Sequence, residues 1–324
     1  MDKLPGVVVL GAASAAELPL SGALEERATL AFATEVKDLK RALPGADILL
    51  GWDFRAGQLQ QAWDAAGDLR WIHWCGAGVD AALFPALRDS DVTLTNARGL
   101  FDQAMAEYVL GLIIALARGF PETIAANAKR EWSYRMTDTI LDKQALVVGV
   151  GSIGRSVARL LHAAGMLVSG VGRAARAGDR EFSHIHGIDD LDRALADADV
   201  VINVTPLTEQ TRNLFSYDEF SAMKPTARFI NIGRGASVDE AALVDALRSG
   251  AIKGAALDVF QTEPLPVDSP LWEVENLMIS PHMSGDTHDY RDIVMRQFLD
   301  NLDRYTSGAP LKNVVDKAAG FVTS

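Results

Sequence analysis

The sequence predicts an α/β protein with two doubly wound domains, each built on a parallel sheet with helices on both faces. Three observations carry this prediction. Short apolar runs alternate with helical patterns, which is typical of buried parallel strands joined by helices. This alternation occurs in two separate series. The length of 324 residues exceeds what one simple hydrophobic core holds and suits two domains.

The first series of apolar runs occupies roughly the first hundred residues. Four runs have the length and composition of buried strands. They are VVVL (7–10), ADILLGW (46–52), LRWIHWCGAGVD (69–80) and DVTLTNARG (91–99). The segment Ala104–Gly119 that follows is apolar on nearly all sides and closed by a glycine. We therefore expect it to be a buried helix between the domains or at a subunit interface.

The second series begins near Leu100. Its predicted strands each run into a turn or loop. They lie in QALVVGVGSIG (144–154), MLVSGVG (166–172), DVVINVTP (199–206), ARFINIGRG (227–235), AIKGAALDVF (251–260) and NLMISPHMSG (276–285). Helices are predicted at RSVARLLHAAG (155–165), DDLDRALADA (189–198), DEAALVDALRSG (239–250) and from Asp286 to about Tyr305.

The charge balance argues against two classes of partner. The chain has 31 basic and 43 acidic residues, with a formal net charge of −12. Non-specific binding to nucleic acids or to acidic membranes needs basic patches, so neither partner is expected. No apolar run approaches the roughly 18 residues of a membrane span, so no membrane association is expected.

The cysteine count and the first residues bear on the compartment. Cys75 is the only cysteine, so an internal disulfide is excluded and a reducing compartment fits. The stretch VVVLGAASAA near the start has some features of a signal peptide, but the preceding residues are weakly charged and the strongly apolar run is short. We expect a buried strand at Val7–Leu10 instead, and a cytoplasmic protein.

A glycine-rich turn follows the first strand of the second series. Gly149, Gly151 and Gly154 form the pattern G-x-G-x-x-G between a predicted strand and a predicted helix. The first glycine allows a tight turn, the second lets the backbone approach a pyrophosphate, and the third permits close packing of helix and strand. The helix N-terminus favours an anion. The turn therefore predicts dinucleotide binding, and a purely structural glycine turn is the alternative.

The strand after this turn ends without an acidic residue. Many NAD-binding domains carry Asp or Glu there, which accepts hydrogen bonds from the ribose hydroxyls and would repel a 2′-phosphate. This chain has Gly172 at that position, followed by Arg173 and Arg176. A guanidinium suits phosphate because its charge is permanent and its donors form a fixed fork. We expect a preference for NADP(H), with NAD(H) possible. The alternative is that both arginines are ordinary solvated residues.

Three polar residues follow three later strands of the second series. Arg234 follows FINIG, Glu263 lies in DVFQTEPLP, and His282 follows LMISP. Ligands of open α/β sheets bind beyond the carboxyl ends of the strands, so these loops are expected to meet. Arginine suits a carboxylate, histidine transfers protons near neutral pH, and glutamate orients an imidazole and stabilises its cation. Taken singly, each residue is more often structural or solvated.

In fixed order along the chain, these stretches resemble the D-isomer-specific 2-hydroxyacid dehydrogenases. Among these, the chain is most similar to the NADP-dependent glyoxylate/hydroxypyruvate reductases. The matching segments cover almost the whole chain, and the first sixty residues match least. They are CGAGVD (75–80), TNARG (95–99), AEYVLG (106–111), VVGVGSIG (147–154), NIGRGASVDEAALVDAL (231–247), GAALDVFQTEPLP (254–266) and SPHMSG (280–285).

The resemblance implies a role for each matching residue. Arg234 would bind the substrate carboxylate and ketone, His282 would protonate the ketone oxygen as hydride arrives, and Glu263 would pair with His282. Ala77 and Gly78 would hold the substrate carboxylate through backbone N–H groups. Trp52 would line the mouth of the cleft, or else is simply a packed loop residue. The implied cofactor residues are Gly149, Gly151, Ser152, Ile153, Gly154, Gly172, Arg173, Arg176, Thr205, Pro206, Ile232 and Asp258, the last contacting the nicotinamide carboxamide.

The resemblance also implies a domain division and a substrate class. Residues 1–99 and 287–324 would form a split, flavodoxin-like substrate domain, and residues 100–286 an inserted Rossmann-type dinucleotide-binding domain. The partner of the histidine is glutamate, where formate dehydrogenases of this superfamily have glutamine. The sequence ends soon after LKNVVD, so the C-terminal regulatory domain of long phosphoglycerate dehydrogenases is not expected. Glyoxylate, hydroxypyruvate or another small 2-keto acid is therefore expected.

Two expectations concern partners, and one alternative stays open. The family's habit of pairing through the cofactor domain implies a homodimer. The pair His184 and His186 could place two metal ligands on one strand face, but no further ligands complete a site, so no metal is expected. The competing function is an NAD(P)-sensing interaction protein on the same fold, with little or no turnover. Loss of NADPH absorbance with a panel of 2-keto acids discriminates the two.

Overall fold

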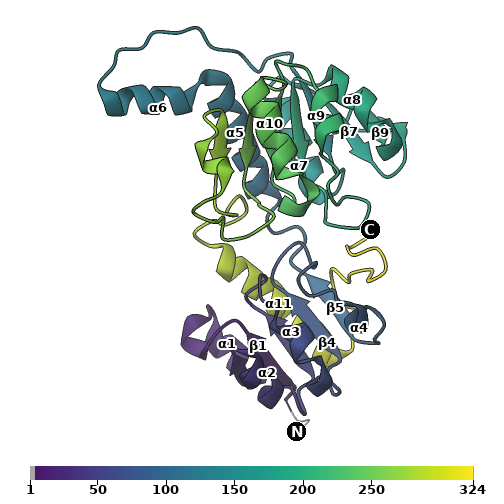
Figure 1. The fold of residues 1–324 in the computed structure, drawn as a ribbon. Coiled ribbons are helices and arrows are strands. Elements are labelled where there is room, and N and C mark those ends of the chain that lie inside the picture. Colours follow the sequence, from purple (N-terminus) through teal and green to yellow (C-terminus); the bar gives the residue numbers. More distant parts are fainter. Residues whose placement is uncertain (1–3, 324) are drawn as a thin grey trace. The chain divides into compact units, whose positions relative to one another are not determined.

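A computed structural model describes residues 4–323 of the chain. The chain forms two compact units, Met1–Phe101 with Thr287–Ser324, and Asp102–Asp286 (Figure 1). Each unit contains a sheet of parallel strands with helices, which confirms the predicted fold class; among the strands of residues 4–323, only the pair β8–β9 is antiparallel. The assignment of the first unit to the substrate stays a prediction.

The first unit has a five-stranded parallel sheet in the order β2-β1-β3-β4-β5, the order of doubly wound, flavodoxin-like sheets. Its strands are β1 (Gly6–Leu10), β2 (Thr29–Ala33), β3 (Ile48–Gly51), β4 (Trp71–Trp74) and β5 (Thr93–Asn96). Its helices are α1 (Ser21–Glu25), α2 (Val36–Ala42), α3 (Gln58–Gln61), α4 (Pro85–Arg88) and α11 (Tyr290–Ser307).

The last helix, α11, joins the first unit because it covers one face of that sheet. Trp71 of β4 stacks on Phe298 and Tyr305 of α11, with ring centroids 5.4 and 5.5 Å apart. The imidazole of His73 lies 5.5 Å from the Phe298 ring. Aromatic residues carry large buried areas, so the sheet face that strand β4 presents requires this helix as its cover. The C-terminal segment therefore returns to the unit in which the chain began.

The second unit has an eight-stranded sheet in the order β13-β12-β11-β10-β6-β7-β9-β8. Only β8 is antiparallel to its neighbour. Its strands are β6 (Gln144–Val148), β7 (Leu167–Gly172), β8 (Arg176–Ala177), β9 (His184–Gly187), β10 (Val200–Asn203), β11 (Arg228–Asn231), β12 (Gly254–Leu257) and β13 (Leu277–Ile279). Its helices are α5 (Asp102–Arg118), α6 (Phe120–Lys129), α7 (Ser152–Ala163), α8 (Leu191–Asp197), α9 (Tyr217–Ala222) and α10 (Glu240–Ser249).

Both faces of this second sheet are buried. Alternate residues of β6 point to opposite faces: Ala145 and Val147 belong to the core shared with α5 and α7, whereas Leu146 and Val148 belong to the core shared with α8, α9 and α10. Burial on two faces explains why the strands read as continuous apolar runs. The predicted buried helix, found as α5, therefore packs inside the second unit.

Exposed apolar side chains concentrate just after α5. Helix α6 and the segment that follows it project from the second unit (Figure 1). None of the α6 residues is buried, and Trp132, Tyr134 and Met136 are 100%, 87% and 91% exposed. Within residues 4–323, no single helix is long and apolar enough to cross a membrane. Helices α5 and α6 reach that length and apolar composition only when they are taken together, and a bend of 62° separates them.

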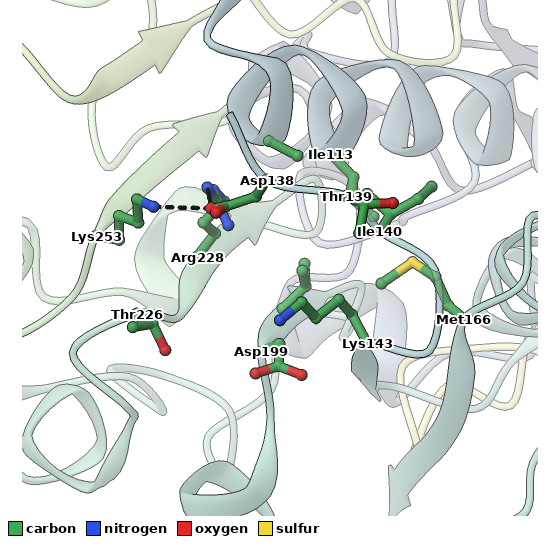
Figure 2. A pocket seen from close by; sticks show the side chains of 12 residues that line it. Ile113, Asp138, Thr139, Ile140, Lys143, Met166, Asp199, Thr226, Arg228 and Lys253 are labelled. Atoms are coloured by element: carbon green, nitrogen blue, oxygen red, sulfur yellow. Dashed lines mark hydrogen bonds and ion pairs between the residues drawn. The ribbon is translucent and has the colours of Figure 1, made fainter. Parts of the chain in front are cut away.

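A cavity of about 130 Å³ lies at the amino ends of the second sheet's strands. Figure 2 shows Asp138 at its wall, beside Arg228 and Lys253. The Asp138 carboxylate accepts hydrogen bonds from the Arg228 guanidinium at 2.6 Å and from the Lys253 ammonium at 2.8 Å. These two cations lower the pKa of Asp138 to about 2. The cavity thus lies at the edge opposite the loops that carry Arg234, Glu263 and His282.

The predicted strands are confirmed within a few residues, and the differences have local causes. The strand expected at Val7–Leu10 is β1, which supports its reading as part of the fold. Helix α11 begins at Tyr290 instead of Asp286. Strands β2, β8 and β9 were not predicted, and neither were the short helices α1, α2, α3, α4 and α9 nor helix α6. Strand β8 has only two residues, and β9 places polar histidines between its buried positions, so neither shows an apolar period.

His73 provides a test of the first unit's core. Its side chain is fully buried, its Nδ1 lies 2.8 Å from the Thr95 hydroxyl, and burial lowers its pKa to about 3. The unfolded chain binds a proton near pH 6.5, whereas the folded chain does not bind it until about pH 3. His73 therefore favours folding above pH 6.5, and this contribution is lost as the pH falls below 6.5.

We expect His73→Gln to flatten the loss of stability between pH 6.5 and 4, by up to about 1.4 kcal/mol per pH unit. Urea unfolding at a series of pH values measures this slope. His162→Gln, at an exposed histidine of α7, is the matched control and should leave the slope unchanged. Equal slopes for wild type and His73→Gln would contradict the assignment.

Candidate active site

The glycine turn has the shape of a dinucleotide cradle. It joins β6 to α7, and Gly149 has a φ of +109°, a conformation that side chains strongly disfavour. A Cβ atom on Gly154 would lie 1.9 Å from the Gly149 carbonyl oxygen, so the helix approaches the strand at a distance that only glycine allows. A Cβ atom on Gly151 would meet nothing within 4 Å, so its backbone faces open space. Ser152 and Ile153, also predicted to bind the cofactor, begin α7.

The end of β7 lies beside this turn. The Gly149 amide donates to the Val171 carbonyl at 2.9 Å, and a Cβ atom on Gly172 would lie 3.1 Å from the Val150 side chain. Arg173 and Arg176 follow and are exposed. Arg176 begins β8, where it pairs with Ile185 of β9. The two arginines predicted to bind the 2′-phosphate therefore follow the strand next to the glycine turn.

The loop after β11 is held by a buried hydrogen-bond network. Asn203, Asn231 and Ser237 are fully buried. The Asn231 amide and the Ser237 hydroxyl both donate to the Arg234 carbonyl. Asn203 donates to Asn231 Oδ1 at 3.0 Å and to Ser237 Oγ at 2.7 Å. This network fixes the backbone from which the Arg234 side chain extends.

The same network reaches the loop after β10. The Asn203 Oδ1 accepts hydrogen bonds from the backbone amide and the hydroxyl of Thr205. Thr205 is buried, whereas the following Pro206 is exposed. Ile232, the remaining apolar residue predicted to contact the cofactor, is 2% exposed and lies just after β11. Asn203 therefore connects the predicted cofactor loop with the Arg234 loop, and all four of its hydrogen-bonding capacities are used.

Glu263 and His282 form a hydrogen-bonded pair. The Nδ1 atom of His282 lies 2.7 Å from Glu263 Oε2, and both side chains are about one quarter exposed. The other carboxylate oxygen of Glu263 accepts the Phe260 backbone amide at 2.9 Å, which orients the carboxylate. His282 has a φ of +52°, a left-handed conformation that is uncommon outside glycine. Such local strain is often found at functional sites.

Asp258 holds the segment that carries His282. The side chain is fully buried, and its oxygens accept hydrogen bonds from the Ser280 hydroxyl at 2.6 Å and the amides of Met283 and Ser284 at 3.0 and 2.9 Å. The Asp258 carbonyl accepts the His282 amide at 2.7 Å. These contacts orient the loop after β13, a function additional to the predicted contact with the nicotinamide.

Neighbouring loops touch through their backbones. A Cβ atom on Gly235 would lie 1.8 Å from the Phe260 carbonyl carbon, so the loop after β11 packs directly on the loop after β12. Asp258 then connects the loop after β12 to the loop after β13. The structure thus places Arg234, Glu263 and His282 on three loops in direct succession at the carboxyl edge of one sheet.

The substrate residues predicted from the first unit lie on its own loops. Ala77 and Gly78 follow β4 and are partly exposed. The Ala77 carbonyl accepts the Asn96 side-chain amide, while within residues 4–323 no protein acceptor meets the backbone amides of Ala77 and Gly78. Trp52 follows β3 and is partly exposed. Cys75 is buried, which raises the pKa of its thiol and disfavours a reactive thiolate.

Sequence reasoning missed Asn203, Asn231 and Ser280. The available signal was a polar residue at or just beyond the end of each apolar strand, in VVIN, RFIN and LMIS. A buried amide or hydroxyl requires partners, and those partners are identifiable only after the loops are placed. No group of three or more potential metal ligands occurs within residues 4–323.

Comparison with known proteins bears on this site. The model of the D-isomer specific 2-hydroxyacid dehydrogenase NAD-binding domain matches residues 110–284. Glyoxylate/hydroxypyruvate reductase B of Pectobacterium carotovorum subsp. carotovorum is 36% identical over 257 residues, which are 76% of this chain and 79% of the relative.

Two solved structures are also similar. A D-isomer specific 2-hydroxyacid dehydrogenase family protein of Aeromonas salmonicida has a TM-score of 0.84 at 33% identity, covering 97% of this chain and 100% of its own. An NADPH-dependent glyoxylate/hydroxypyruvate reductase of Sinorhizobium meliloti, solved with NADP and sulfate, has a TM-score of 0.83 at 29% identity, covering 98% and 100%. Together with the ordered motifs, these matches establish that the chain belongs to the D-isomer-specific 2-hydroxyacid dehydrogenase family, the members of which are NAD(P)-dependent oxidoreductases.

Proposed function

We propose that the protein is a cytoplasmic reductase that uses NADPH to reduce small 2-keto acids of the glyoxylate or hydroxypyruvate type. The observation that carries this proposal is the pair of Glu263 and His282, joined at 2.7 Å one loop away from Arg234. The names of the relatives support the substrate class, because the similar proteins of Pectobacterium and Sinorhizobium are glyoxylate/hydroxypyruvate reductases.

The chemistry requires a hydride donor, which the bound dinucleotide supplies. His282 donates a proton to the ketone oxygen, and Glu263 holds the imidazole by accepting from Nδ1 and stabilises its cation. Arg234 binds the substrate carboxylate and ketone through the donors of its guanidinium. In the first unit, we propose the backbone amides of Ala77 and Gly78 as donors for a substrate carboxylate and Trp52 as a further substrate contact.

The glycine turn and the exposed arginines support the cofactor assignment. Gly149, Gly151 and Gly154 leave backbone open to a pyrophosphate at the start of α7, where the helix favours an anion. Gly172 carries no carboxylate to repel a 2′-phosphate, and Arg173 and Arg176 supply cations beside it. We propose that these residues select NADP(H).

Exposed apolar residues support a homodimer. Ile124 of α6 is 69% exposed, and Trp132, Tyr134 and Met136 in the following segment are nearly fully exposed. Large contiguous apolar surface is uncommon on monomeric proteins and marks interaction sites. We propose that a second copy of the chain covers this segment. Residues Ala104–Gly119 were the part of the sequence expected at a subunit interface, but the buried side of that helix packs in the core of its own unit.

The first test removes the proton donor. We expect His282→Ala to lower kcat with glyoxylate or hydroxypyruvate by about 10²- to 10⁴-fold, because a positioned acid contributes that much. The Kd for NADPH should stay within a few-fold. Consumption of NADPH over a panel of 2-keto acids measures kcat, and His162→Ala, at an exposed histidine, is the control. A variant that retained more than about a tenth of wild-type kcat would refute the role of His282.

The second test concerns the dinucleotide. Wild type should have a higher kcat/KM with NADPH than with NADH, and Arg173→Ala with Arg176→Ala should remove most of that preference, because two cations beside the phosphate are lost. Arg248→Ala, an exposed arginine of α10, is the control. A wild type that prefers NADH, or a double variant that keeps the full preference, would show that these arginines do not select the cofactor.

The third test concerns assembly. Light scattering at micromolar concentration should give twice the 34.8 kDa mass of one chain. Trp132→Lys with Met136→Lys should shift the mass toward the monomer, because charges replace exposed apolar side chains. Exchange of Trp272, an exposed tryptophan outside this segment, for lysine should leave the mass unchanged. A wild-type mass of a single chain would refute the homodimer.

A further inference from the structure

Arg155 holds the segment that follows β7. It lies in the first turn of α7, the helix that begins on the glycine turn. Its Nη2 donates to Asp179 Oδ2 at 2.7 Å, and its Nη1 donates to Glu181 Oε2 at 2.8 Å. Its guanidinium carbon also lies 5.6 Å from the centre of the Phe182 ring. One side chain of α7 therefore contacts three residues of a single turn.

That turn closes the hairpin of β8 and β9. The Asp179 amide donates to the Phe182 carbonyl at 2.9 Å, and Asp179 Oδ1 accepts the amides of Glu181 and Phe182. A Cβ atom on Gly178 would lie 2.1 Å from the Ser183 carbonyl oxygen, so the two arms approach very closely. Asp179 thus organises the turn through one oxygen and binds Arg155 through the other.

The hairpin determines where the two predicted phosphate-binding arginines lie. Arg176 is the first residue of β8 and pairs with Ile185, which is fully buried in the core beneath. Arg173 lies between the end of β7 and β8, a connection of only three residues. With both ends of this short connection in strands, a shift of the hairpin must move Arg173 and Arg176 together.

Charge supports the same conclusion. The net charge of the chain is −12, but residues 155–187 contain more basic than acidic side chains. They include five arginines (155, 159, 173, 176 and 180) and only two carboxylates (Asp179 and Glu181). Both carboxylates are paired with Arg155, and Glu181 also has Arg159 at 3.9 Å. Arginines therefore outnumber carboxylates in this part of the chain, and within the screening length of about 8–10 Å an excess of positive charge attracts a phosphate.

We propose that Arg155 is a positioning residue for cofactor selectivity. It anchors the β8–β9 hairpin to α7 through Asp179, Glu181 and Phe182, and so determines where Arg173 and Arg176 lie relative to the 2′-phosphate of NADP(H). Arg155 itself does not touch that phosphate. This inference rests on the proposed preference for NADP(H).

The experiment compares Arg155→Leu with Arg248→Leu, which removes the same charge from an exposed position of α10. In Arg155→Leu, the Kd of NADPH and of 2′,5′-ADP, measured by fluorescence titration, should rise about tenfold. The Kd of NADH should change less than about twofold, because NADH lacks the phosphate. Amide hydrogen exchange of residues 173–183 should accelerate in Arg155→Leu only.

The outcomes separate this inference from the proposed function. If Arg155→Leu weakens NADPH and NADH equally, or leaves the exchange of residues 173–183 unchanged, the positioning role is wrong. If wild type binds NADH more tightly than NADPH, the proposed cofactor preference is wrong, and a role for Arg155 in selecting NADP(H) is overturned with it. Faster exchange would then still show that Arg155 holds the hairpin.

Discussion

The parallel pairing of β6, β10, β11, β12 and β13 is the constraint on which the candidate site depends. Parallel strands all end at the same edge of the sheet, so each delivers its loop to one place. Those loops carry the glycine turn, Thr205, Arg234, Glu263 and His282. Polar backbone and side-chain groups become buried where the strands end, and Asn203, Asn231 and Asp258 form hydrogen bonds with them. The same hydrogen bonds also orient the candidate catalytic loops.

The split of the first unit has a comparable physical origin. Its sheet presents aromatic surface at Trp71 that the first hundred residues do not cover. Helix α11 supplies Phe298 and Tyr305 for that face, with ring stacking at 5.4 and 5.5 Å. Burial of two large rings against a third is a substantial stabilisation, of the order of a few kcal/mol. In the sequence, the second unit is therefore inserted between two segments that pack on each other in the first unit.

Two edges of the second unit differ in their chemistry. At the amino ends of the strands, Asp138 pairs with Arg228 and Lys253, and its carboxylate is stabilised in the charged form. At the carboxyl ends, the glutamate of the Glu263–His282 pair faces an imidazole, and His282 adopts a left-handed backbone. A paired carboxylate of low pKa is chemically inert at neutral pH, whereas a histidine held by a carboxylate is suited to proton transfer.

The sequence alone determined the class of fold and most of its strands, and it indicated part of the candidate site, because continuous apolar runs and glycine spacing are local signals. VVGVGSIG and the loops with Arg234, Glu263 and His282 could be recognised without coordinates. Helix α6 and strand β8 could not, since neither has an apolar period that distinguishes it from a solvated segment.

Only the tertiary structure decided how those residues are held. Asn203 and Asn231 are 28 residues apart and Asp258 and Ser284 are 26 apart, and their contacts exist only after parallel strands bring the loops together. Arg155 and Asp179 likewise meet across 24 residues. A sequence records which groups can form hydrogen bonds, but a hydrogen bond requires donor and acceptor within about 3 Å, and that distance is set by the packing of the whole sheet.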